Sequence, residues 1–227
     1  MSDRSPSAPP PPSPRTTGDR LRRRRTAAGL SLREFARRVG VSASTVSQIE
    51  RGLISPSVAT LYAFVQELGM SLDELFAVEG VTTSRAAQPP PPRRDDPGDG
   101  APIDRGGRPS GGLVRRGERP RIAFSSGVTW ERLTAPGPAQ AEFLYVVYPP
   151  RSTSSRTLMR HKGREFGHVL RGRLEVTLGF DRHVLEAGDS IRFDCTQPHR
   201  LAALGDEAAH AIWFVAESEG DVTAQHD

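Results

Sequence analysis

Cysteine, lysine and long apolar runs are scarce in this sequence, and each scarcity excludes a class of protein. The 227 residues include one cysteine, Cys195, and one lysine, Lys162. A single cysteine excludes an intramolecular disulfide and indicates a reducing compartment. No apolar run approaches the roughly 20 residues that a membrane-spanning helix needs, and the N-terminal region has no apolar segment of the kind that a secretory signal requires. We therefore expect a cytoplasmic protein.

The distribution of residue types divides the chain into five segments. Residues 1–17 are rich in proline and serine and almost free of apolar residues, so we expect a disordered tail. Residues 79–112 contain PPPP, RRDDPGDG and GGRPSGG, which are typical of a flexible linker. A helical pattern occupies residues 18–78, a strand pattern occupies residues 113–217, and residues 218–227 form a second tail. The expected fold is an all-α domain and an all-β domain joined by the linker.

Two short helices joined by a tight turn are predicted between Gly29 and Pro56. Ser31 and Glu34 have the spacing of a capping box, and Gly40 is suited to the left-handed end of the first helix. Ser42 caps the second helix, which ends near Gly52. The inward apolar positions are Leu32, Phe35, Ala36 and Val39 on the first helix and Val46 and Ile49 on the second.

The outward face of the second helix is small, polar and uncharged, unlike an ordinary solvent face. Its residues are Ala43, Ser44, Thr45, Ser47 and Gln48. Such a face suits a helix that lies in the major groove of DNA. The same end of the chain is basic, because residues 1–78 contain eleven arginines and seven acidic residues, and positive charge favours contact with phosphates.

The stretch LSLREFARRVGVSASTVSQIERG, followed by SP, resembles the lambda-repressor-like helix-turn-helix of XRE-type regulators over residues 18–78. The resemblance implies a five-helix DNA-binding domain. It differs at Leu32, where many relatives carry a glutamine that contacts phosphate, and the neighbouring Arg33 could take over that contact. The implied DNA-binding residues are Arg33, Ser42, Ala43, Ser44, Thr45, Ser47, Gln48 and Arg51. The alternative is a small helical bundle that binds no DNA.

Three further helices complete the predicted bundle. The first covers Asp19 to Ala28 and includes the consecutive arginines 22–25, of which at most two or three can face one phosphate strand. Ser57 caps another helix, with Val58, Leu61, Val65 and Leu68 on one face. Ser71 and Glu74 repeat the capping-box spacing and open a short last helix.

Many short strands at regular spacing, broken by turn residues, predict a β-sandwich or barrel from Leu113 onward. The predicted strands lie near residues 122–124, 128–133, 143–148, 166–170, 173–178, 183–185, 190–193, 199–204 and 209–215.

Two motifs in this half, HKGREFGHVLRG and GDSIRFDCTQPHR, resemble those of the cupin family, a jelly-roll barrel. Glu165 and Gly172 fit the first motif, whereas Met159 stands where its first histidine is usual. In the second motif Asp194, Thr196 and Ala203 replace the usual proline, glycine and asparagine. The resemblance implies three metal ligands, His161, Glu165 and His199, a set that suits Fe(II), Zn or Mn. The alternative is a hydrogen-bonded polar cluster that shapes a ligand pocket.

An effector pocket in the barrel is expected to be lined by Tyr145, Arg160, Phe193 and Trp213. The arginines at 160, 164, 192 and 200 would favour an anionic effector if they turn inward. Cys195 is either a soft ligand or sensor thiol or, more commonly for a lone cysteine, inert. His168 lies an odd number of residues from Glu165, so on a regular strand it points to the opposite face.

These features predict a sequence-specific transcriptional regulator whose partners are double-stranded DNA, a small-molecule effector and a second copy of the chain. A single helix-turn-helix reads one half-site, so two copies are needed. The rival prediction is a mononuclear iron enzyme similar to a hydroxyalkyl phosphonate epoxidase, with the same His/Glu/His set. A third is a sugar- or polyamine-binding module without catalysis or DNA binding.

Overall fold

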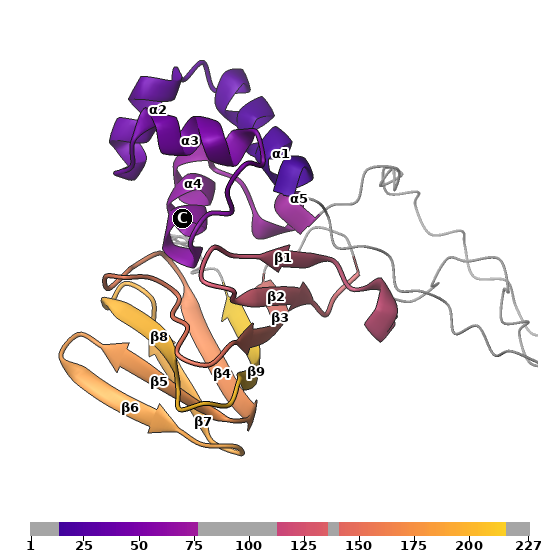
Figure 1. Ribbon diagram of the computed structural model, residues 1–227, viewed down its shortest axis with the longest axis vertical. Coiled ribbons are helices and arrows are strands. Elements are labelled where there is room, and N and C mark those ends of the chain that lie inside the picture. Colours follow the sequence, from indigo (N-terminus) through magenta and orange to yellow (C-terminus); the bar gives the residue numbers. More distant parts are fainter. Residues whose placement is uncertain (1–13, 77–112, 136–140, 217–227) are drawn as a thin grey trace, which may run out of the picture.

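The structure is a computed structural model, and it describes residues 14–76, 113–135 and 141–216. The expected linker at 79–112 and the expected tail at 218–227 lie outside the described residues, as do residues 1–13. Figure 1 shows a helical domain stacked on one end of a β-barrel. The two-domain organisation that the sequence predicts, α followed by β, is confirmed.

Five α-helices form the first domain of the described chain. They are α1 (Pro14–Ala27), α2 (Leu32–Val39), α3 (Ala43–Glu50), α4 (Val58–Leu68) and α5 (Leu72–Phe76). Serine side chains cap three of them as predicted, because the hydroxyls of Ser31, Ser42 and Ser57 accept hydrogen bonds from backbone N–H groups three residues later. Gly40 and Gly69 end α2 and α4 in the left-handed conformation.

Helix α1 begins earlier than the sequence indicates. The expected tail extended to residue 17 and the expected helix began at Asp19, but α1 begins at Pro14, a residue favoured in the first helical turn. Thr17 and Gly18 are buried, and a Cβ on Gly18 would lie 2.3 Å from the carbonyl oxygen of Ile49. This end of α1 is therefore ordered by close packing against α3, a tertiary contact that no local pattern indicates.

The second domain of the described chain has nine strands after a short 3-10 helix, η1 (Arg116–Glu118). The strands are β1 (Arg121–Ala123), β2 (Thr129–Arg132), β3 (Ala141–Tyr148), β4 (Arg164–Arg171), β5 (Arg173–Leu178), β6 (Asp181–Leu185), β7 (Ser190–Asp194), β8 (His199–Leu204) and β9 (Ala209–Ala216). Each overlaps one predicted strand, because short β-branched and aromatic runs broken by turn residues mark the strands.

The described strands form two antiparallel sheets that enclose the barrel core. The larger sheet has the order β1-β2-β3-β9-β4-β7, and the smaller has the order β6-β5-β8. Burial alternates along β4 and β8, so Glu165 and His199 both face inward. Val169, Leu174 and Val176 are among the fully buried residues between the sheets.

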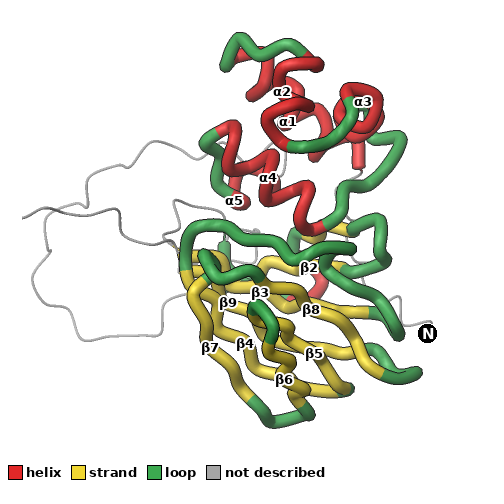
Figure 2. The backbone as a smooth tube through the Cα atoms, turned by 90° about the vertical axis from the view of Figure 1, so that its left-hand side faces the viewer, coloured by secondary structure: helices red, strands yellow, loops and turns green. Residues whose placement is uncertain are grey.

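Helix α4 is the part of the helical domain nearest to the barrel, as Figures 1 and 2 both show. Its Tyr62 stacks face to face on His161, with ring centroids 4.1 Å apart and an interplanar angle of 6°. The same ring makes an edge contact with Trp130 at 5.7 Å, and Ser125 N–H donates to the carbonyl of Pro56. The linker alone suggested independent domains, whereas these contacts pack the two domains together.

Candidate functional site

The outward face of α3 lies on the domain surface, as the predicted recognition helix requires. Val46 and Ile49 are buried, Ser44 is exposed, and the side chains of Ala43, Thr45, Ser47 and Gln48 are partly exposed. The main helical partners of α3 are α1 and α2, and both views place α3 well away from the strands. Nothing in the described barrel covers the face.

Exposed arginines flank this uncharged face. Arg33 on α2 and Arg51 at the end of α3 are exposed, and Arg51 Nε donates to the carbonyl of Ser47 at 3.2 Å. The arginine run on α1 is divided, because Arg22, Arg23 and Arg24 are exposed whereas Arg25 is buried. Arg25 is therefore a core residue of the domain and not a phosphate contact.

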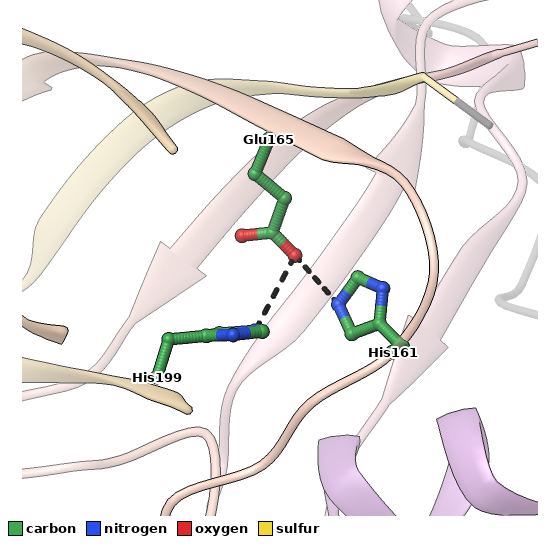
Figure 3. A group of neighbouring side chains, drawn as sticks. All are labelled: His161, Glu165 and His199. Atoms are coloured by element: carbon green, nitrogen blue, oxygen red, sulfur yellow. Dashed lines mark hydrogen bonds and ion pairs between the residues drawn. The ribbon is translucent and has the colours of Figure 1, made fainter. Parts of the chain in front are cut away.

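His161, Glu165 and His199 come together inside the barrel mouth (Figure 3). His161 is held in the turn before β4 by its backbone N–H, which donates to the carbonyl of Cys195. Glu165 lies on β4, and His199 begins β8. The three side chains are buried, and one nitrogen or oxygen from each lies within 4.8 Å of the others. The three residues predicted as metal ligands thus lie close together.

The hydrogen bonds around the two imidazoles fix which nitrogen faces Glu165. Nδ1 of His161 lies 2.9 Å from the carbonyl oxygen of Lys162, and Nδ1 of His199 lies 2.9 Å from that of Gln197. A carbonyl can only accept, so each Nδ1 carries the hydrogen. Each Nε2 therefore points at Glu165, whose Oε1 lies 2.9 Å from His161 Nε2 and 3.8 Å from His199 Nε2.

Glu165 is ionised despite its burial. Burial alone raises the pKa of this carboxyl, but the hydrogen bond and charge of His161, the charge of His199 and the indole N–H of Trp213 lower it below its usual value. Trp213 Nε1 donates to Glu165 Oε2 at 2.8 Å. Burial also lowers the pKa of His199 below its usual value.

These residues fit a divalent metal ion. Among the described residues, His199 Nε2 is a buried nitrogen without a hydrogen-bond partner, and a neutral imidazole lone pair is what a metal binds. The carbonyls that hold each Nδ1 supply the orienting contacts that metal-binding histidines normally have. Two imidazoles and one carboxylate could hold Fe(II), Zn or Mn.

Cys195 is not poised to act as a thiolate. Its side chain is fully buried, and burial together with the charge of Glu165 raises the pKa of the thiol well above its ordinary value. The convergent cluster within the described chain consists of His161, Glu165 and His199 and does not include the sulfur.

Two of the four residues predicted to line an effector pocket lie in the barrel interior. Trp213 bonds Glu165, and the ring of Phe193 lies 5.1 Å from that of His199. Tyr145 is wrong as a lining residue, because it alternates with the buried Leu144 and bonds His210 on the outer side of β3.

The arginines predicted near the barrel mouth do not turn inward. Arg160 is wrong as a lining residue because it is exposed. Arg164 and Arg192 are exposed as well, and Arg200 pairs with Glu175. Arg160 lies outside the strands, and Arg164, Arg192 and Arg200 occupy outward-facing positions of β4, β7 and β8. The expectation of an anion site built from arginines is therefore not met.

Sequence reasoning missed Tyr62, which lies opposite His161. A small cavity of about 20 Å³ next to His161, Glu165 and His199 is bounded by Tyr62 and Val58 together with barrel residues, so α4 closes the barrel mouth. A signal was available, since Tyr62 extends the apolar stripe of α4 at the position after Leu61. A widened apolar stripe indicates more than one packing partner.

Comparisons with known proteins agree with both halves of this structure. Residues 21–75 match the helix-turn-helix family model, and residues 133–215 match the cupin domain model. The chain is 27% identical to the HTH-type transcriptional regulator PuuR of Escherichia coli over 186 residues, which cover 82% of this chain and 86% of the relative.

One solved structure shares the fold over most of the chain. An HTH_3 family transcriptional regulator from Vibrio cholerae aligns with a TM-score of 0.61 and 24% identity, covering 91% of this chain and 98% of that one. A hydroxypropylphosphonic acid epoxidase from S. wedmorenis aligns with a TM-score of 0.36 and 21% identity, covering 89% and 98%, which is too distant to transfer an activity. The chain therefore combines an XRE-type helix-turn-helix domain with a C-terminal cupin domain, and it is similar to a transcriptional regulator over most of its length.

Proposed function

We propose that this regulator binds its operator through the outward face of α3, as a homodimer, and that its cupin domain binds a small effector. The observation that carries the proposal is the combination of a properly capped α2–α3 pair with an accessible face of small, uncharged side chains. Such side chains let the helix approach base edges closely, whereas lysine or glutamate would hold it away. Because the similar regulator PuuR comes from a bacterium, we also propose a cytoplasmic location.

The place of each residue on α2 or α3 indicates which part of the DNA it would contact. Ala43, Ser44 and Thr45 lie in the first turn of α3, the end of a recognition helix that contacts base edges. Ser47 and Gln48 continue the same face. Arg33 and Arg51 are exposed at its margins, where their charges would meet phosphates and set the register of the protein on the duplex.

A binding measurement on the DNA upstream of the gene tests the proposal. Fluorescence anisotropy across salt concentrations should show specific binding that weakens steeply as salt rises, because phosphate contacts release counterions. Ser44→Glu places a charge on the reading face and should abolish specific binding. The matched control is Thr157→Glu, at an exposed threonine of the barrel. If Ser44→Glu binds as tightly as Thr157→Glu, α3 is not the recognition helix.

A row of exposed phenylalanines supports dimerisation through the larger sheet. Phe143, Phe214 and Phe166 are 36–38% exposed. They lie directly opposite one another on the neighbouring strands β3, β9 and β4, with ring centroids 6.3 and 5.9 Å apart. An aromatic row of this kind on an outer sheet face is typical of a protein interface.

A divalent metal at His161, Glu165 and His199 is part of the proposal. Bound metal would relieve the buried, unpartnered His199 Nε2 and would tie β8 to the turn before β4. Metal analysis of purified protein should give close to one ion per chain, and His199→Ala should lose it. His168→Ala is the matched control, because His168 is exposed on the opposite face of β4 and bonds Ser190. Equal metal content in the two variants would refute the assignment.

The iron-enzyme alternative draws on the same three residues but lacks space for an organic substrate beside Glu165 and His199. The cavity that adjoins Glu165 and His199 holds about 20 Å³, which is enough for about one water molecule. An oxidoreductase would need room for substrate and oxygen at the metal. The regulator is therefore the better-supported function.

A further inference from the structure

A second, larger cavity lies between the two domains and is separated from the first by one stacked pair of rings. Among the described residues it is bounded by α4, α5, β3, β9 and the turn that carries His161. Its volume is about 220 Å³, which approaches the roughly 300 Å³ at which ordinary small-molecule sites begin. The barrel cavity has about 20 Å³. The interdomain cavity thus has the room for an effector that the barrel interior lacks.

Tyr62 and His161 form the partition between these cavities. Tyr62 lines both of them, whereas His161 lines the larger one and Glu165 the smaller. The tyrosine and the histidine are 8% and 5% exposed, and their flat stack at 4.1 Å leaves no gap between the rings. A molecule in the interdomain cavity would therefore touch a residue of the DNA-binding domain and a residue of the metal cluster together.

The lining of the interdomain cavity is mainly apolar with a cation at one side. Val65, Met70 and Leu72 form the wall on the helical domain, and Val215 faces them from the barrel. Lys162, the chain's single lysine, also lines the cavity, and its side chain is exposed. Glu142 lines the cavity too but is engaged in an interaction of its own. An apolar wall beside an available ammonium group suits a small carboxylate with an aliphatic or aromatic body.

We propose that the effector site is this interdomain cavity and that it takes a small monocarboxylate with an apolar body, whose carboxylate is held by Lys162. The inference rests on the proposed function, since it locates the effector of the regulator. It moves that effector from the barrel interior to the contact between the sensor and the DNA-binding domain.

The position of the cavity gives a direct route from ligand to DNA. Helix α4 packs against α1 and α2 within the helical domain, so a ligand that shifts α4 relative to the barrel shifts α2 and α3 with it. In a dimer such a shift changes the separation of the two recognition helices, and DNA affinity depends on that separation.

Isothermal titration calorimetry on the full-length protein without DNA tests the site. The probes are hexanoate, hexanol and hexylamine, which share an apolar body and differ in the polar end. We expect hexanoate to bind about tenfold more tightly than hexanol, as a charge-assisted hydrogen bond contributes, and hexylamine to bind no better than hexanol. Saturation with hexanoate should change DNA affinity at least about fivefold.

Three variants make the test specific. Lys162→Gln should reduce hexanoate binding to the hexanol level, whereas Arg182→Gln, which removes an exposed positive charge on β6, should leave it unchanged. Gln66→Trp fills the rim of the cavity from an exposed position and should abolish binding of hexanoate and hexanol, with thermal unfolding confirming that the variant is folded.

The proposal is overturned if none of the three probes binds at millimolar concentration, if hexanoate binds no better than hexanol, or if the folded Gln66→Trp variant binds hexanoate like the parent. If the hexanoate experiment fails, the operator-binding measurement made without ligand is unaffected. The two experiments therefore distinguish an absent effector site from an absent DNA-binding function.

Discussion

Arg25 and Glu50 form a buried ion pair that joins α1 to α3. Arg25 Nε and Nη2 donate to the two carboxylate oxygens of Glu50 at 2.6 and 2.9 Å, and Nη1 donates to the carbonyl of Leu30. Both side chains are less than a tenth exposed. This pair has two hydrogen bonds, and the third guanidinium nitrogen also donates one, so the pair holds the end of α3 against α1 at a position where the sequence shows only a run of arginines.

Glu50→Ala leaves the guanidinium buried without its partner and should lower the free energy of unfolding by about 3 kcal/mol. Urea unfolding followed by circular dichroism measures the effect. Glu34→Ala is the matched control, because Glu34 pairs with Arg38 at a position about 40% exposed, and such pairs contribute less than about 1 kcal/mol. If both variants lose the same free energy of unfolding, the buried Arg25–Glu50 pair does not stabilise the contact between α1 and α3.

Gly167 leaves room for the indole that holds Glu165. A Cβ at this position would lie 2.1 Å from Cζ3 of Trp213, so Gly167→Ala should displace the ring and break its hydrogen bond to Glu165. We expect a shifted tryptophan emission spectrum and weaker metal binding, and Trp213→Phe should weaken metal binding in the same way. An unchanged spectrum in folded Gly167→Ala protein would contradict this role.

Helices α3 and α4 carry the same cap, which gives a clean comparison between two elements. Ser42 and Ser57 each accept from the backbone N–H of a threonine three residues on, at 3.0 and 3.1 Å. Each serine→alanine change should cost about 1 kcal/mol of stability. Ser42→Ala should also weaken operator binding, because it frays the first turn of the recognition helix, while Ser57→Ala should not. Urea unfolding measures the stability of both variants, and anisotropy titrations measure their operator affinity. If the two variants bind the operator equally well, Ser42 is not part of the DNA-binding surface.

At the level of elements, local signals were sufficient to find the helices and strands. Serine caps and glycine ends fixed α2, α3 and α4, and short apolar runs broken by turn residues indicated β4 and β8, the strands that bear Glu165 and His199. The alternating burial along β3 argues against Tyr145 as a lining residue, because Leu144 beside it is the apolar, buried neighbour. Burial pattern along a strand is thus a better guide to a pocket than proximity to a motif. The start of α1 was missed because its order comes from a tertiary contact of Gly18.

At the level of the whole molecule, the sequence could not predict that the domains pack together. Tyr62 contacts Trp130 and His161 across the boundary between the domains. The chain between Tyr62 and Trp130 includes the linker, whose composition indicates two independent domains. Contacts between distant segments follow no period, so neither the partition between the cavities nor the interdomain cavity was accessible from the pattern. The widened apolar stripe of α4 indicates a further packing partner, but it does not show which one.

The phenylalanine row predicts how assembly controls DNA binding. Phe214 lies between Phe143 and Phe166, so Phe214→Glu places a charge at the centre of the proposed dimer face and should give a monomer in analytical ultracentrifugation. Because one helix-turn-helix contacts only a half-site, operator affinity should then fall more than about tenfold.

Phe180→Glu is the matched control, since Phe180 is a fully exposed phenylalanine in the turn between β5 and β6. A dimeric Phe214→Glu variant with full operator affinity would place the interface elsewhere, whereas a monomeric variant with full affinity would show that this regulator reads DNA without a partner.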